Sequence, residues 1–201
     1  MPRALLPALL FTVVAVPLAA QTTAMAEAAS SAWTAEQQIA AAVLPLPETM
    51  RDGAAVFGWK GKSLVPLRAG TNAMLCLAED PARKNFHVVC YHRDLDPFMA
   101  AGRARTALGL TREAVDSARH ADIAAKKWAM PSHPTLLYEI FAPEGAYDVT
   151  SGKLTGGTPV FVIYTPYATD GALGASLAGL GGGTPWMMYP GEPWAHLMIT
   201  P

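Results

Sequence analysis

The stretch AMLCLAEDPARKNFHVVCYH, residues 73–92, decides the fold of this chain. Its first six and last seven residues are apolar or β-branched runs typical of strands, and the polar segment between them contains Pro81. An antiparallel hairpin centred near Ala82 places Cys76 opposite Cys90, at the short Cα separation that a disulfide can bridge. We therefore predict a hairpin closed by a Cys76–Cys90 disulfide; the alternative is a free, reactive thiol.

The N-terminus predicts export. A short positive start precedes the apolar run of residues 4–18, and small residues ending in Ala-Met-Ala follow it. This order is typical of a secretory signal peptide, cleaved after Ala26 or, as a second choice, after Ala20; the alternative is an uncleaved anchor. We expect residues 1–26 to be the signal peptide and 27–201 one domain in a secreted or periplasmic protein. An even number of cysteines fits that oxidising environment.

The charge balance excludes two classes of partner. The chain has 15 Lys and Arg against 16 Asp and Glu, and Arg3 is the one charged residue among the first 26. The mature chain therefore keeps 14 basic and 16 acidic residues, a net charge of −2. With no basic stripe, nucleic-acid binding has no electrostatic footprint, and we expect no membrane binding after signal cleavage.

The remaining patterns predict an α+β fold with a mainly antiparallel sheet. Thr34 and Gln37 form a capping box that opens a helix, and Pro45 ends it. Strand-like runs and turns over residues 54–92 predict an N-terminal β-meander of about four strands. A central helical pair and C-terminal strands follow. The helical pair is expected over 94–109 and 111–130, and the strands over 134–143, 158–167 and 196–200, the last of them buried.

Asp96 has a structural interpretation. It stands before Pro97, at a position suited to the first turn of a helix. Its carboxylate is predicted to accept the free backbone N–H groups of that turn.

Histidines and carboxylates suggest a possible metal site. His92 and His196, with Asp94 or Glu192 as a third ligand, would hold zinc or another divalent transition metal. Such a site would activate water in a metal-dependent hydrolase. The spacing matches no diagnostic zinc motif, so the default interpretation is partly buried histidines without a metal or other cofactor.

The segment PWMMYPGEPW, residues 185–194, concentrates aromatic side chains between prolines. Trp186, Tyr189 and Trp194 are candidate contacts for a ligand or a protein partner, because rigid aromatic side chains supply contact area at low entropic cost. The alternative is that this segment covers an open end of the sheet and packs its tryptophans inward.

RAGTNAMLCLAEDP (residues 68–81), CYH (residues 90–92) and the ending PWAHLMITP resemble an uncharacterised family of small exported bacterial proteins. The resemblance implies export and no activity, and it assigns no site residue. We therefore expect a non-catalytic domain that binds a small ligand or a protein. The metal-dependent hydrolase is the alternative.

Overall fold

The computed structural model of the protein describes residues 33–201. The predicted signal peptide and both candidate cleavage sites lie outside these residues. Among the helices described, none combines the length and the apolar character that crossing a membrane requires.

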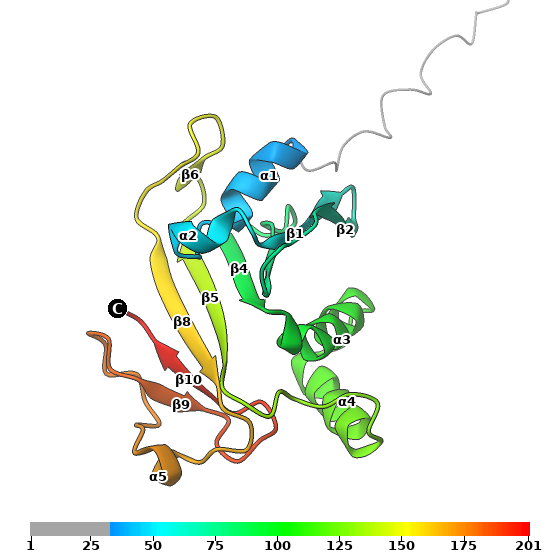
Figure 1. The fold of residues 1–201 in the computed structure, drawn as a ribbon, viewed down its shortest axis with the longest axis vertical. Helices are drawn as coiled ribbons and strands as arrows, with labels where there is room; N and C mark the ends of the chain where they lie inside the picture. Colours follow the sequence, from blue (N-terminus) through cyan, green and yellow to red (C-terminus); the bar gives the residue numbers. More distant parts are fainter. Residues whose placement is uncertain (1–32) are drawn as a thin grey trace, which may run out of the picture.

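One mixed sheet of eight strands forms the centre of the molecule (Figure 1). Its strands in chain order are β1 (Ala55–Lys60), β2 (Ser63–Arg68), β3 (Met74–Leu77), β4 (Phe86–His92), β5 (Thr135–Ala142), β8 (Thr158–Tyr164), β9 (Trp186–Met188) and β10 (His196–Ile199). They lie side by side in the order β2-β1-β3-β4-β5-β8-β10-β9. The α+β class and the mainly antiparallel sheet are thus confirmed.

The predicted meander is wrong in one pairing. β1 and β2 form the expected hairpin, but β3 then returns to the far side of β1 and pairs with it in parallel, Val56 opposite Cys76. The reason is geometric: β1 and β2 already share one edge, so a third strand that joins the sheet at β1 must use the free edge. The segment between β2 and β3 carries the chain back, and Thr71 and Asn72 donate to the carbonyl oxygen of Gly53.

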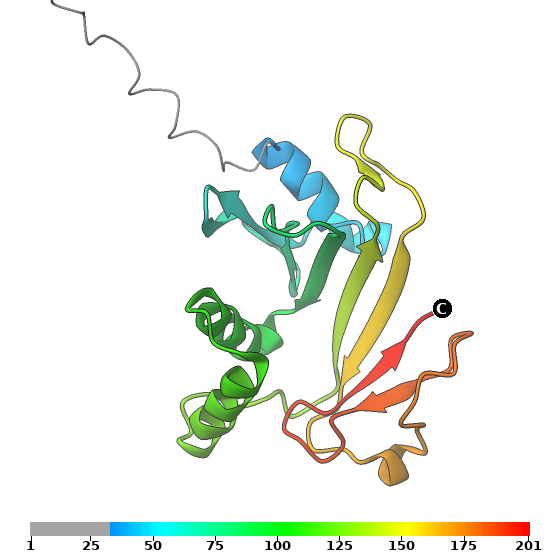
Figure 2. The ribbon, with the colours of Figure 1, turned by 180° about the vertical axis from the view of Figure 1, so that it is seen from behind.

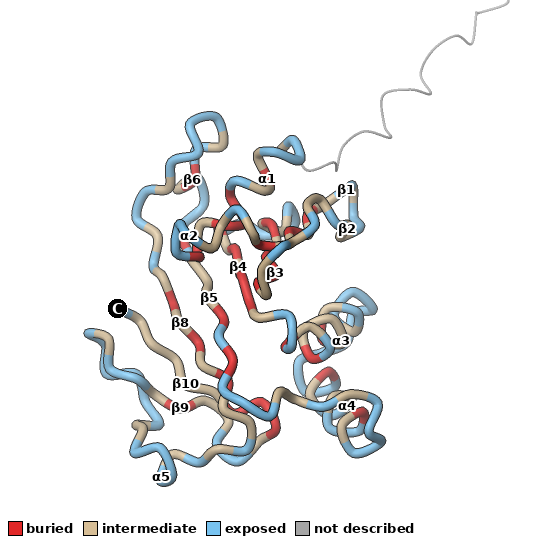
Figure 3. The backbone as a smooth tube through the Cα atoms, viewed as in Figure 1, coloured by how far each residue is buried: buried red, intermediate tan, exposed pale blue. Residues whose placement is uncertain are grey.

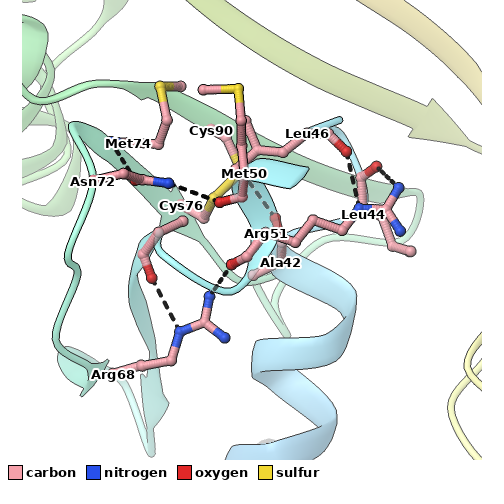
Figure 4. Close-up of a disulfide and its surroundings, with 11 residues drawn as sticks. Ala42, Leu44, Leu46, Met50, Arg51, Arg68, Asn72, Met74, Cys76 and Cys90 are labelled. Atoms are coloured by element: carbon pink, nitrogen blue, oxygen red, sulfur yellow. Dashed lines mark hydrogen bonds between the residues drawn. A yellow bond between two sulfur atoms is a disulfide. The ribbon is translucent and has the colours of Figure 1, made fainter. Parts of the chain in front are cut away.

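The β3–β4 hairpin has the predicted register. Cys76 stands opposite Cys90, and their sulfur atoms are bonded at 2.04 Å. Both cysteines are fully buried, and Figure 4 shows the disulfide beside Ala42 and Leu46, which belong to the same apolar cluster. The disulfide therefore joins two central strands underneath the N-terminal helices.

Helical segments cover both faces of the sheet (Figures 1 and 2). One face, which carries Val88 and Cys90, packs against α1 and the segment after it. The opposite face, which carries Tyr91 and Leu137, packs against the helical pair α3–α4. The helices are α1 (Ala35–Ala42), α2 (Glu48–Arg51), the 3-10 turn η1 (Arg93–Leu95), α3 (Asp96–Ala107), α4 (Arg112–Ala124) and α5 (Asp170–Leu173). A separate two-stranded ribbon pairs β6 (Tyr147–Asp148) with β7 (Lys153–Leu154).

The capping box predicted for the first helix is confirmed, and residue-specific caps also stand at two ends of the central helical pair. Thr34 and Gln37 form the capping box of α1, and Thr111 caps α4 through the N–H of Ala114. Gly109 follows α3 with φ of +80°, a left-handed conformation that glycine adopts without steric cost. α3 and α4 therefore lie within the two predicted ranges, but α4 ends at Ala124, before the predicted end at residue 130.

The C-terminal strands β9 and β10 extend the sheet beyond β8. β10 was predicted to be buried, but its four residues are half-buried, because it lies near the sheet edge, with only β9 beyond it. Figure 3 shows the buried residues gathered along the central strands β4, β5 and β8.

Candidate functional site

The predicted metal ligands do not come together. The Asp94 carboxylate lies 3.5 Å from His92 Nδ1 and 3.5 Å from His133 Nε2, where β4 passes into η1. His196 is on β10, and strands β5 and β8 lie between it and β4. Adjacent strands are spaced by about 4.8 Å, so His92 and His196 cannot share an ion whose bonds are about 2 Å long.

Glu192, the other proposed carboxylate ligand, pairs with His120 of α4 at 2.9 Å. His196 donates from Nδ1 to the carbonyl oxygen of Trp194 at 2.8 Å, and burial lowers its pKa. Across residues 33–201, no three His, Cys, Asp or Glu side chains are placed to hold a metal ion. The ligand set proposed from the sequence is therefore not assembled.

The aromatic segment packs largely inward. Trp194 is only 4% exposed, and its ring lies 5.8 Å from that of Phe98 in α3. Its proposed contact with a ligand or partner is therefore corrected to a role in the core. Trp186 and Tyr189 are half-buried, and the Tyr189 hydroxyl accepts from Arg112 of α4. The segment thus ties the C-terminal strands to the helical pair.

A groove of about 930 Å³ lies between the β1–β2 hairpin and the α3–α4 pair. Both features project to the same side of the sheet in Figures 1 and 2. The groove floor is apolar, because Leu77 and Val89 lie on the part of this face that the helices leave half-exposed. Trp59 and Leu64 line it from the hairpin. The other apolar lining residues are Ala78, Tyr91, Met99, Ala104, Ala107, Leu110 and Val115.

Cationic side chains surround this apolar floor. Lys62, Arg83 and Arg112 line the groove, and in the described part of the chain none of them pairs with a carboxylate. Asp80 is the one lining carboxylate outside the ion pairs. Two further lining arginines are neutralised, Arg103 by Asp96 at 3.0 Å and Arg119 by Asp116 at 3.1 Å. The groove therefore has an excess of positive charge.

Asp96 does not cap the helix as predicted, but pairs with Arg103, which lines the groove. Leu95 occupies the N-cap position of α3 without a side-chain bond to the helix. The Asp96 carboxylate instead accepts from the Tyr91 hydroxyl at 2.8 Å and from Arg103, which also donates to that hydroxyl at 2.6 Å. Burial raises the pKa of Tyr91, so its hydroxyl keeps its proton. The network orients Arg103 along the groove.

His87 links a carboxylate to a guanidinium at the groove end formed by the β3–β4 loop. Its Nε2 lies 3.1 Å from the Glu139 carboxylate, and its Nδ1 lies 2.8 Å from Arg83 Nη1. The ring stacks on Phe141 with centroids 4.2 Å apart. Side-chain exposures of 18% for His87 and 14% for Glu139 show that this pair is largely shielded.

A smaller hollow of about 570 Å³ borders Asp94 and His133. Its carboxylates are already engaged, Asp94 by two histidines and Asp96 by Arg103. The larger groove combines an apolar floor with cations that lack carboxylate partners, and it is therefore the better candidate site.

Sequence reasoning did not identify this groove. No pattern in the sequence assigned a role to His87, or to Glu139 within β5. One signal was present: Glu139 is the single charged residue in the otherwise uncharged strand TLLYEIFA. A lone carboxylate in such a strand requires a partner.

No protein-family model, curated protein or solved structure matches this chain. The resemblance to a family of exported proteins therefore stays a prediction.

Proposed function

We propose that this protein is an exported, non-catalytic binding protein whose groove holds a small apolar ligand with a negatively charged group. The observation that carries the proposal is the pairing of an apolar floor with cations that lack carboxylate partners. A volume of about 930 Å³ falls within the range of roughly 300–1,000 Å³ in which proteins hold small ligands.

The chemistry of the lining supports a ligand of this kind. Apolar surface buried on the floor contributes roughly 25 cal/mol per Å². An anionic group gains charge-assisted hydrogen bonds from Lys62, Arg83 or Arg112 without displacing a carboxylate from them. A neutral ligand would leave those cations unused, and a cationic ligand would be repelled.

Calorimetric titration with decanoate and decanol tests the proposal, because the two probes share one apolar chain and differ in charge. We expect wild-type protein to bind decanoate more tightly than decanol. Leu110 lines the groove, whereas Leu108, 78% exposed, does not. We expect Leu110→Asp to weaken decanoate binding at least tenfold, or about 1.4 kcal/mol.

Leu108→Asp is the matched control, since it places the same charge on the same connection but outside the groove. It should change the dissociation constant less than twofold, and far-UV circular dichroism should show both variants folded. Absence of decanoate binding to wild-type protein, or equal binding by both variants, would contradict the proposal.

A further inference from the structure

The hydrogen bonds of His87 define its protonation. A guanidinium is always charged and can only donate, so Nδ1 of His87 must accept from Arg83 through a free lone pair. The ring proton then resides on Nε2 and is donated to Glu139. His87 is therefore a neutral imidazole in this arrangement, and the charged Arg83 guanidinium donates its hydrogen bond to an uncharged acceptor.

We infer that Arg83 and His87 form the head-group subsite of the groove, where they bind the anionic group of the ligand as His87 takes up one proton. The inference rests on the proposed function and names the part of the groove that recognises charge. A carboxylate is a stronger acceptor for a guanidinium than a neutral imidazole, so the ligand takes the place of Nδ1 as the partner of Arg83.

The freed Nδ1 then receives a proton from solvent, while Nε2–H stays bonded to Glu139. Without this proton, the carboxylates of the ligand and Glu139 would face one another across an uncharged ring. With it, the imidazolium lies between two negative groups and donates to both. The balance is one ligand and one proton bound for each broken bond between Arg83 and His87.

Other charged groups of the groove would also respond to a bound anion. Lys62 and Asp80 both line the groove. Glu79 adjoins Asp80, and burial followed by repulsion from Asp80 raises its pKa to about 7. Because Glu79 titrates in the same pH range as histidine, proton uptake is best measured in a Glu79→Gln background.

The first test removes the guanidinium. Arg83→Gln should weaken decanoate binding at least tenfold and leave decanol binding within twofold. Lys84→Gln is the matched control, because it removes a positive charge from the adjacent residue, which does not line the groove. It should leave both affinities within twofold of wild type. A similar loss of decanoate affinity in both variants would mean that the net positive charge of the loop, and not Arg83 itself, attracts the anion. It would overturn the subsite.

The second test counts protons. Calorimetric titrations of Glu79→Gln protein with decanoate, near pH 7 in Tris and in Bis-Tris, give the protons bound from the difference in heat between the buffers. We expect uptake that approaches one proton per decanoate. Adding His87→Gln, whose amide still reaches toward Glu139, should abolish the uptake, whereas adding His133→Gln should preserve it.

The outcomes separate this inference from the function on which it rests. One outcome is that Leu110→Asp weakens decanoate binding, Arg83→Gln leaves it unchanged and no proton is taken up. This outcome would overturn the subsite and leave the groove as the binding site. No decanoate binding at all would overturn both. Uptake that persists in the His87→Gln variant would assign the proton elsewhere and overturn the role of His87.

Discussion

The Gln38 side chain makes the backbone hydrogen bonds that a neighbouring strand would otherwise make with Trp59. It is 4% exposed on α1, and its amide oxygen accepts from the N–H of Trp59 at 2.7 Å while its amide nitrogen donates to the Trp59 carbonyl at 3.1 Å. β3 is too short to reach this residue: its last pairing with β1 is Leu77 opposite Phe57. The Gln38 side chain therefore satisfies the backbone N–H and C=O of Trp59, which no strand pairs on that side. Trp59 is also one of the residues that line the groove.

We predict that Gln38→Leu lowers the free energy of unfolding by about 2–4 kcal/mol. Leucine fills a similar volume, so the loss reports the removal of the hydrogen bonds that join the Gln38 amide to the N–H and C=O of Trp59 and to the C=O of Trp33, at roughly 1 kcal/mol each. Chemical denaturation followed by circular dichroism measures it. Gln37→Leu, the same change at the neighbouring cap, should cost about 1 kcal/mol. Equal losses from the two variants would contradict this role.

Residue identity alone predicted only part of this chemistry. The capping box of Thr34 and Gln37 was correct because helix caps depend on a few neighbouring residues. Asp96 was misassigned because its partners, Tyr91 and Arg103, are brought to it by the strand before it and the helix after it. A carboxylate in the first turn of a helix satisfies the rule for a cap, and only packing decides between the two roles.

Among the elements, the β3–β4 hairpin was the most predictable. Its turn and its two cysteines both specify one register, and the structure has that register. The place of β1 was not predictable in the same way. β3 pairs with β1 in parallel because the chain crosses back past the β1–β2 hairpin. No local sequence pattern predicts which edge of β1 the returning strand will join. Local sequence therefore specified the hairpins but not their order.

We predict that Cys76→Ala/Cys90→Ala lowers the free energy of unfolding by about 3 kcal/mol. The disulfide closes a short loop, with 14 residues of sequence separation, and the chain-entropy model assigns about that value to a loop of this size. Alanine is preferred to serine because both positions are fully buried and a hydroxyl would lack a partner. Urea denaturation of the oxidised wild type and the double variant measures the difference.

The reduced wild-type protein is the control for this pair. It should lose stability by a similar amount, because reduction removes the same cross-link without changing the packed volume greatly. Unchanged stability after reduction would mean that the unfolded chain gains little freedom from opening this loop, and it would contradict the entropic argument.

At the scale of the whole molecule, the groove is a product of tertiary structure. Its lining comes from the β1–β2 hairpin, the β3–β4 hairpin and the α3–α4 pair, which are separate in sequence. The helices cover only the part of the sheet near Tyr91 and Leu137, held there by Phe98 and Trp194. The uncovered part becomes the floor. Of the two roles that the sequence left open for the aromatic segment, partner contact or inward packing, Trp194 has the second, and it packs on Phe98 of α3 beside the groove.

The N-terminus bears on the molecule as a whole because the described residues begin at Trp33, after both predicted cleavage sites. Trp33 already packs on Tyr147, with ring centroids 5.3 Å apart, and α1 follows directly. Cleavage after Ala26 or Ala20 would thus leave every described contact intact. The buried disulfide agrees with export, since such bonds form and persist in oxidising compartments.

We therefore predict that the full chain, expressed in a bacterium, is recovered from the periplasm or the medium as residues 27–201. Its intact mass should be that of the cleaved chain less two hydrogens, because the cysteines are oxidised; cleavage after Ala20 would give the next larger species. Replacing the apolar run at Leu9 and Leu10 with charged residues should retain the protein in the cytoplasm with free thiols. An uncleaved chain in the membrane fraction would instead identify residues 4–18 as an anchor, and the groove would then act at a membrane surface.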